Sequence, residues 1–267
     1  YGITWVDLIF PFFLFSMGAA IPLSLGRQLE KGTGKLKLLK KTIIRWMKLT
    51  FFAIFVIHVY PYMLGYPAPW MNELVALAAF ALMFLIFMRN PFHLSKWGNR
   101  TMNTLAYAAA VALILFQPYA EGKPFMLKDE DIIMLILANV SLTGAVIYLL
   151  TPHKPMARLA LIPLLMAFYL SAKTDGSWQQ AMRDFTFAPW LYHVAYQEYL
   201  LIIIPGMVAG DLMTRWLKAE DALRAHSRLR AAPWVALIAL TLIVTNVVCL
   251  YSRLLVVNLV LTAALST

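Results

Sequence analysis

Ionisable and amide side chains inside long apolar runs are the residues of this sequence best placed to do chemistry. They comprise two acids, two histidines and two asparagines: Asp7, Glu198, His58, His193, Asn139 and Asn246. Carboxylates and imidazoles can orient reactants and can accept or donate protons, which is general acid–base chemistry. Because such groups are costly inside a membrane span, each is a candidate functional residue.

Most of these residues also have a purely structural interpretation. Asp7 could cap its helix, since an acid in the first turn interacts favourably with the N-terminal dipole. His58 could be a packed histidine bonded to a backbone carbonyl, and His193 could be an interfacial residue. Asn139 could hold neighbouring helices together by hydrogen bonds. Glu198 is the hardest to explain in this way, because a carboxylate deep in a span needs a partner or a proton.

The chain that must position these residues is too apolar for a soluble fold. It has 267 residues, of which 61% are hydrophobic and 13% are charged, and its mean hydropathy is +0.71. A soluble domain carries about 25% charged residues. The composition also excludes a disordered chain and a collagenous fibre, and the single cysteine, Cys249, excludes a disulfide scaffold. We therefore expect an all-α, polytopic transmembrane helix bundle.

The apolar residues form eight segments that are long enough, or nearly long enough, to cross a bilayer. Each should be a helix, because lipid offers no partner to an unpaired backbone group. They cover residues 4–25, 43–64, 70–88, 102–118, 131–150, 156–172, 189–212 and 233–251. The run Leu254 to Leu265 is too short to span and would belong to a partial ninth helix. We interpret residues 1–267 as a single transmembrane domain that is truncated at both ends.

Basic residues gather on one side of this predicted bundle. If Tyr1 faces outward and the segments alternate, most of the 23 lysine and arginine residues fall in inner loops. This asymmetry fits the positive-inside rule, and it explains the net charge of +10 by the lipid bilayer as partner, with no nucleic acid. The short loops, and the absence of glycosylation sequons from outer loops, favour a bacterial inner membrane with residue 1 on the periplasmic side.

The topology places the candidate residues of five spans in the outer half of the membrane. A polar cavity that opens outward, above a basic inner face, is the simplest arrangement that satisfies them. The first inner loop is denser in basic residues than orientation requires, and Lys37, Lys41 and Arg45 belong to it. It could be a topology and lipid signal, or a site for a phosphate-bearing cytosolic ligand.

Two stretches resemble a known family. The opening GITWVDLIFPFFLFSMGAAIPLSL and the basic KLLKKTIIRWMKL resemble the transmembrane acyltransferases typified by heparan-alpha-glucosaminide N-acetyltransferase, especially their uncharacterised bacterial branch. The matching positions of the first stretch are Gly2, Thr4, Asp7, Phe10, Pro11, Phe13, Phe15 and Gly18. The stretch QEYLLIIIPGMVAGD is similar to the family's E-G-L-L-S-x-x-P segment, with Tyr199 in place of its glycine. Its matching positions are Glu198, Leu200, Leu201 and Pro205.

The resemblance implies an enzyme that moves an acetyl group from cytosolic acetyl-CoA to an amino sugar or glycan on the outer face. It implies no metal. The family's catalytic histidine would fall before Tyr1, so the fragment lacks it, and GYPAPWMNEL lacks the family's R-x-P-G-V-L-Q-R pattern. The acceptor therefore stays open.

The resemblance and the residue types together suggest a division of roles. Asp7 would orient the missing histidine, and Glu198 or His58 would take the acceptor's proton. The acceptor site would include Asn139, His193 and Asn246. The donor's phosphates would be held by Lys37, Lys41 and Arg45.

Two other functions compete with acyl transfer. A transporter or flippase for a sugar-linked or anionic substrate would also have interrupted helices and a polar site within the membrane. The lack of an internal repeat and the clustering of polar groups in one half of the membrane count against it. The other alternative is a scaffold without chemistry, and Asp7 and Glu198 count against that. A homodimer is an open option for the assembly.

Overall fold

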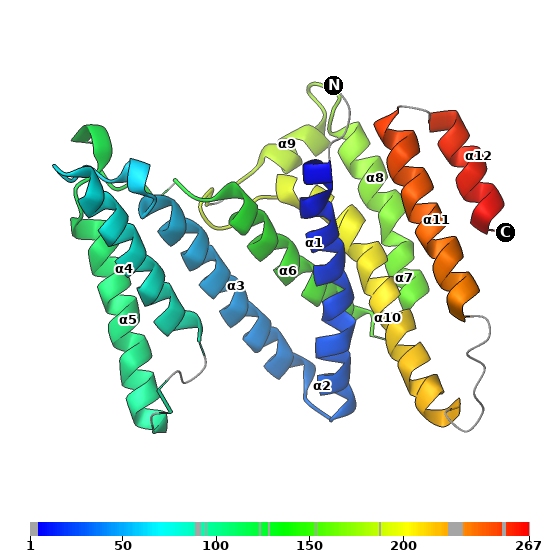
Figure 1. Ribbon diagram of the computed structural model, residues 1–267, viewed down its shortest axis with the longest axis horizontal. Helices are drawn as coiled ribbons and strands as arrows, with labels where there is room; N and C mark the ends of the chain where they lie inside the picture. Colours follow the sequence, from blue (N-terminus) through cyan, green and yellow to red (C-terminus); the bar gives the residue numbers. More distant parts are fainter. Residues whose placement is uncertain are drawn as a thin grey trace. The chain divides into compact units, whose positions relative to one another are not determined.

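In the part of the chain that the computed structural model describes, the regular secondary structure is helical (Figure 1). Described are residues 5–88, 92–93, 95–122, 124–127, 129–152, 154–186, 188–223, 232–252 and 255–266. These residues contain no β-strand, only the isolated bridges Leu64–Tyr119 and Ala188–Tyr192. The predicted all-α fold is confirmed.

The chain divides into two compact units. Unit 1 comprises Tyr1–Thr33, Ile147–Leu164 and Tyr199–Thr267, and unit 2 comprises Gly34–Val146 and Leu165–Glu198. The division passes through two helices, α6 (Ile132–Leu150) and α8 (Leu161–Ser171).

Unit 1 is built on the pairing of α1 (Trp5–Ile21) with α10 (Leu200–Leu223). Three glycines allow this close approach. A Cβ on Gly18 would collide with the carbonyl oxygen of Ile203, and a Cβ on Gly206 would collide with that of Phe15. Gly210, one turn after Gly206, meets the carbonyl oxygen of Ala19 in the same way. Small residues at this spacing let two membrane helices pack backbone against backbone.

The helix that begins as α1 changes its winding before it ends. The segment Pro22–Gly26 is a π-helical turn, η1, and α2 (Arg27–Glu30) follows it. Pro22 has no N–H to donate to the carbonyl four residues earlier, so the α-helical bond at this position cannot form. A π turn, with hydrogen bonds five residues apart, resolves the break without ending the helix.

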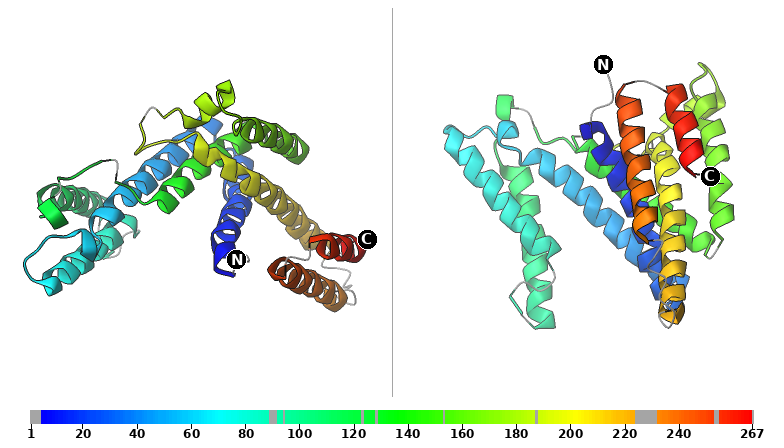
Figure 2. Two further views of the ribbon diagram at one scale, coloured as in Figure 1. Left: turned by 90° about the horizontal axis from the view of Figure 1, so that it is seen from above. Right: turned by 45° about the vertical axis from the view of Figure 1, so that its right-hand side comes forward.

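The remaining helices of unit 1 are α7 (Pro155–Leu159), α11 (Ala232–Tyr251) and α12 (Leu255–Ser266). α11 and α12 lie side by side in both views of Figure 2.

Unit 2 holds α3 (Lys35–His58), α4 (Pro69–Phe87), α5 (Lys96–Phe116) and the larger part of α6. α4 and α5 lie side by side, as both views of Figure 2 show. Together with the second half of α3 they enclose an apolar core that includes Phe55, Met83 and Ile114.

Short elements complete unit 2. They are η2 (Pro61–Met63), η3 (Ala120–Gly122), α9 (Trp178–Asp184) and η4 (Ala195–Tyr199).

Four described helices are long and apolar enough to cross a membrane, and they indicate an integral membrane protein. They cover Asp7–Glu30, Pro69–Phe87, Ile132–Leu150 and Ala195–Leu217. Two shorter apolar helical segments are Pro155–Ser171 and Leu237–Cys249.

Several of the expected segments have different boundaries in the structure. The segment expected at 102–118 begins at Lys96, and the segment expected at 4–25 continues to Glu30. The segment expected at 43–64 is a helix that begins at Lys35, because its basic residues are helical too, and it ends at His58, shortly before Pro61. The segment 156–172 is interrupted at Ala160, since Pro163 cannot donate to the carbonyl of residue 159. The segment 189–212 becomes α-helical only at Leu200, after η4, and runs on to Leu223.

Candidate functional site

His58 ends α3 at the wall of a cavity in unit 2. The cavity has a volume of about 240 Å³, and its lining includes His58, Tyr62, Tyr119, Pro124 and Asp129. The imidazole is 1% exposed. Its Nδ1 lies 2.7 Å from the carbonyl oxygen of Ile54, and its Nε2 lies 3.1 Å from that of Met126. The neutral ring can donate one of these hydrogen bonds, and the doubly protonated ring can donate both.

Aromatic rings and one amide hold His58 in place. The ring of Phe125 lies 4.7 Å from the imidazole, and the ring of Tyr119 lies 5.7 Å from it, centre to centre. The amide nitrogen of Gln117 donates to the backbone carbonyl of His58 over 2.7 Å. Hydrogen bonding to a backbone carbonyl and packing against aromatic rings fit the structural interpretation of this residue.

Three consecutive acids, Asp129, Glu130 and Asp131, begin with a residue of the cavity wall. Asp129 lines the cavity itself. The Oε2 atom of Glu130 is buried without a hydrogen-bond partner among the described residues. Burial, and secondarily the neighbouring carboxylate of Asp129, raises the pKa of Glu130 to about 7. Asp131 caps α6, because its Oδ1 accepts a hydrogen bond from the backbone N–H of Met134 over 2.9 Å.

Asn139 lies fully buried in the middle of α6. The indole N–H of Trp46, on α3, donates to its Oδ1 over 3.4 Å. This bond orients the amide and leaves its Nδ2 without a partner in the described part of the chain. One turn further along α6, the hydroxyl of Thr143 lies 3.3 Å from that of Tyr192. Asn139 thus joins two helices and still presents an unused donor.

His193 and Glu198 lie in the segment that leads into α10. His193 is half-buried, and its ring packs against Tyr196 at 4.5 Å between ring centres. Its Nε2 is buried without a partner among the described residues. The hydroxyl of Tyr169 anchors this segment by donating to the carbonyl of Val194 over 2.7 Å. Glu198 lies in η4 and is exposed. It lies before the first α-helical turn of α10 and within the apolar segment Ala195–Leu217.

Asp7 and Asn246 belong to unit 1. Asp7 lies in the first turn of α1 and is exposed, where an acid interacts favourably with the helix dipole. The Nδ2 of Asn246 donates to the carbonyl of Leu242 over 2.8 Å. Its Oδ1 accepts from the hydroxyl of Thr262 over 3.4 Å, which joins α11 to α12.

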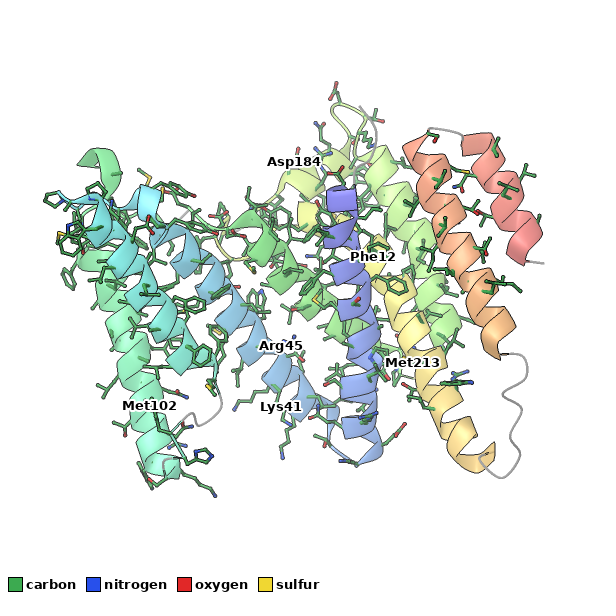
Figure 3. The ribbon with its side chains drawn as sticks, in the orientation of Figure 1. Phe12, Lys41, Arg45, Met102, Asp184 and Met213 are labelled. Carbon is green, nitrogen blue, oxygen red and sulfur yellow. The ribbon has the colours of Figure 1, made fainter. Side chains whose placement is uncertain are left out.

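The three basic residues expected to hold a donor all lie on α3 and are exposed. They are Lys37, Lys41 and Arg45. Residues four apart in a helix face the same side, so the spacing aligns the three cations along one stripe. Figure 3 labels Lys41 and Arg45 on this helix.

A buried ion pair in unit 1 was missed by the sequence analysis. The guanidinium of Arg158 is fully buried and donates through Nη2 to Oδ2 of Asp211 on α10. The guanidinium carbon of Arg158, Cζ, lies 4.9 Å from the ring centre of Tyr148. Tyr148 and Asp211 also line a cavity of about 70 Å³, together with Glu30. The available signal was Asp211, the one acid between Glu198 and Glu220 in a largely apolar run.

The structure brings only some of the predicted residues together. Among the described residues, no three histidine, cysteine, aspartate or glutamate side chains gather as a metal site would require. His58, Asn139, His193 and Glu198 all belong to unit 2, whereas Asp7 and Asn246 belong to unit 1.

Comparison with known proteins identifies a short local similarity. The chain is 46% identical over 70 residues to the heparan-alpha-glucosaminide N-acetyltransferase of Mus musculus. That stretch is 26% of this chain and 10% of the mouse protein, so the match spans about a tenth of the relative's length. No solved structure matches the chain. Residues 1–213 match the family described as a domain of unknown function, DUF5009, and the chain belongs to this family.

Proposed function

We propose that this protein is an integral membrane acyltransferase. In the proposed reaction an acetyl group, or another acyl group, passes from cytosolic acyl-CoA to an amino sugar or glycan on the outer face. The observation that carries the proposal is the 46% identity to an N-acetyltransferase over 70 residues, in a chain with four helices apolar enough to span a bilayer. The bacterial inner membrane, with residue 1 on the periplasmic side, is the proposed location.

The donor would bind at the beginning of α3. Lys37 and Arg45 are eight residues apart, which corresponds to about 12 Å along a helix. Their stripe can therefore contact several phosphates of one ligand, and exposed cations are what a polyphosphate requires. The helix begins after Gly34, whose backbone leaves the first N–H groups uncapped by a side chain. A helix N-terminus of this kind also favours an anion.

Glu198 is the better of the two proposed proton acceptors. It is exposed, whereas both nitrogens of His58 already lie within hydrogen-bond distance of backbone carbonyls. In the transfer, the acceptor nitrogen or oxygen bonds to the thioester carbon, the carbon–sulfur bond breaks, and the departing thiolate takes up a proton. The acceptor's proton passes to the base. Asp7, in the first helical turn, would orient a catalytic histidine.

Two of the proposed acceptor-binding residues have buried polar atoms whose hydrogen-bonding capacity is unused. The Nδ2 of Asn139 and the Nε2 of His193 lack partners among the described residues. Asn246 is already engaged between α11 and α12, so it supports the bundle in this proposal rather than the acceptor.

The donor site is tested by calorimetry of acetyl-CoA binding to the purified protein in lipid nanodiscs. We expect micromolar binding that is weakened at least about tenfold when Lys37, Lys41 and Arg45 are all changed to Ala, because each charge-assisted contact contributes about 1.5–3 kcal/mol. The matched control changes Lys96, Arg100 and Lys173, which are also exposed, to Ala. Absence of binding to folded wild-type protein, or an equal loss in both triple variants, would overturn the donor assignment.

Transport is the second candidate, and the buried pair of Arg158 and Asp211 favours it. Charged residues inside apolar helices often mark a substrate or ion path. Proteoliposomes without acetyl-CoA separate the two functions. Uptake of labelled amino sugar in its unmodified form would indicate transport, whereas product formation that depends on acetyl-CoA would indicate acyl transfer.

A further inference from the structure

An apolar groove lies between α4 and α5 in unit 2. Its volume is about 580 Å³, which is in the size range of ligand sites in proteins. α4 contributes Leu82 and Leu85 to the lining. α5 contributes a face whose residues recur at helical spacing and include Gly98, Met102, Leu105 and Ala109. The groove is open along this face, because Leu105 is 64% exposed and Ala109 is exposed too.

The chemistry of the lining favours an apolar occupant over water. Thr101 is the only polar side chain among the described residues of the lining, and its hydroxyl already donates to the carbonyl of Trp97 over 3.1 Å. An ordered water needs about two to four polar partners. Small residues such as Gly98 and Ala109 leave the space that a larger side chain would occupy. A chain of methylene groups would fill this space and supply the dispersion contacts that the lining otherwise lacks.

The length of the groove matches one leaflet of a membrane. Its lining on α5 runs from Gly98 to Ala109, eleven residues apart, which corresponds to about 17 Å along a helix. The hydrocarbon core of a bilayer is about 30 Å thick, so one leaflet contributes about 15 Å. α4, the other wall, is itself long and apolar enough to cross a membrane. The groove therefore fits an acyl chain of one lipid better than a helix that crosses the whole bilayer.

Positive charge gathers at the end of the groove where Gly98 lies. Lys96 and Arg100, two residues to either side of Gly98 in α5, are both exposed. The guanidinium carbon of Arg100 lies 5.7 Å from the ring centre of Trp97, which is 77% exposed, and tryptophan is enriched at membrane–water interfaces. The sequence contains no aspartate or glutamate between residues 74 and 120, so no neighbouring acid in the chain offsets these cations. This end of the groove is suited to a phosphate.

We propose that this groove binds a single anionic phospholipid of the phosphatidylglycerol type. One acyl chain would lie between α4 and α5, and the phosphate would accept hydrogen bonds from Lys96 and Arg100. Basic pockets between membrane helices bind anionic head groups in this way. A second copy of the chain fits less well, because a two-fold dimer within one membrane joins the same face of both copies and would bring their cations together. The inference concerns lipid binding, and it stands whether or not the protein transfers acyl groups.

The test measures which phospholipids stay bound to the purified protein. Native mass spectrometry follows delipidated protein in detergent during titration with dioleoyl-phosphatidylglycerol or with dioleoyl-phosphatidylcholine, which have the same acyl chains. We expect one phosphatidylglycerol to bind at least about tenfold more tightly than phosphatidylcholine, because only the former carries a net negative charge that Lys96 and Arg100 can attract. Equal affinities would overturn the proposal.

A variant that fills the groove tests the position of the acyl chain. Ala109→Phe places a ring in the groove and should weaken phosphatidylglycerol binding about tenfold, because the acyl chain can no longer be buried there. Ala108→Phe adds the same ring at an exposed position outside the lining and should bind normally. Both residues are exposed, so both variants should fold, which circular dichroism checks. Normal phosphatidylglycerol binding by Ala109→Phe would contradict the proposal.

Removal of the two cations tests the position of the head group. Lys96→Ala combined with Arg100→Ala should reduce the preference for phosphatidylglycerol over phosphatidylcholine about tenfold. The matched control combines Lys35→Ala with Lys40→Ala, which removes two exposed cations of the same unit outside the groove, and it should keep the preference. A preference that survives the loss of Lys96 and Arg100 would refute the head-group site.

Other occupants of the groove would give different results. sn-Glycerol 3-phosphate carries the phosphate without acyl chains, and it should not displace phosphatidylglycerol when both are present at equal concentration. Displacement would indicate a phosphate site without an acyl chain and would overturn the proposal. A dimer in the mass spectrum that Ala109→Phe separates, with lipid binding unchanged, would instead assign the groove to a second copy of the chain.

Discussion

The two units of this protein accommodate polar groups among apolar helices differently. In unit 1 the buried guanidinium of Arg158 is paired with Asp211 through Nη2, although its Nε and Nη1 lack partners among the described residues, and glycines bring α1 and α10 into backbone contact. Unit 2 keeps a cavity of about 240 Å³ whose lining includes His58 and Asp129. Close packing around an ion pair suits a scaffold, whereas a cavity suits a ligand.

Breaking the ion pair should have the largest effect on stability. Arg158→Met leaves Asp211 as a buried charge without a partner, and we expect a loss of about 3–5 kcal/mol. Thermal unfolding of the wild-type and variant proteins in detergent measures this loss of stability. The exposed pair of Arg183 and Asp184 provides the control, since Arg183→Met should change the unfolding temperature little. If Arg158→Met unfolds like wild type, the pair does not stabilise unit 1. The double variant with Asp211→Leu should recover part of the loss.

Disrupting the glycine contacts between α1 and α10 should have the second-largest effect on stability. Gly206→Leu forces a side chain into the carbonyl oxygen of Phe15, so α1 and α10 must separate, at about 3 kcal/mol. A lower unfolding temperature and faster proteolysis of α10 are the expected results. Gly34→Ala meets no atom within 4 Å and should shift the unfolding temperature far less. Equal shifts in the two variants would mean that the helix contact is not tight.

Substitution of His58 tests whether the cavity of unit 2 tolerates a change in its wall. His58→Leu removes the hydrogen bonding of the imidazole to the carbonyls of Ile54 and Met126 and should destabilise the protein by about 1–2 kcal/mol. Tyr62→Leu, at the same cavity but exposed, should leave the unfolding temperature unchanged. A loss in His58→Leu as large as that in Arg158→Met would erase the contrast between the units.

The smallest expected effect is a pH dependence from Glu130. Its pKa is about 7 in the folded protein and about 4.5 when unfolded, so the folded state binds the proton more tightly. Its stabilising contribution is complete below pH 4.5 and is lost as the pH rises through 7. After allowance for solvent, the change amounts to about 1 kcal/mol. Glu130→Gln should flatten the dependence of unfolding temperature on pH between 4.5 and 8, and an unchanged slope would contradict the assignment.

Helix positions were the most predictable part of the fold. The apolar run at 70–88 became α4 at Pro69–Phe87, because lipid permits few backbone solutions other than a helix. The ends of the helices were harder to predict, since they depend on local chemistry. Pro163 breaks the helix near Ala160, and the residues before Leu200 form a 3₁₀ turn instead of an α-helical one.

The candidate site was less predictable than the helices. Hydropathy correctly drew attention to His58 and Asn139 as buried polar residues, but it could not indicate their partners. Arg158 and Asp211 are 53 residues apart in sequence, and a pairing at that separation leaves no periodic signal. Gln117 gives no signal in the sequence, because an amide at the end of an apolar run is ordinary. Only the structure shows that its Nε2 donates to the His58 carbonyl and that its Oε1 has no donor among the described residues.

The π-helical turn at Pro22–Gly26 makes the length of this segment matter more than its composition. Each residue of an α-helix turns the chain by about 100°, so inserting one residue beside this turn would rotate everything that follows on the same helix by that amount. Glu30 would then leave the small cavity that it shares with Tyr148 and Asp211. Deleting one residue within the π turn can instead restore an α-helical turn, so single-residue insertions near Pro22 should be tolerated far less well than deletions or substitutions. Family members that differ in length there should present a different side chain to Asp211.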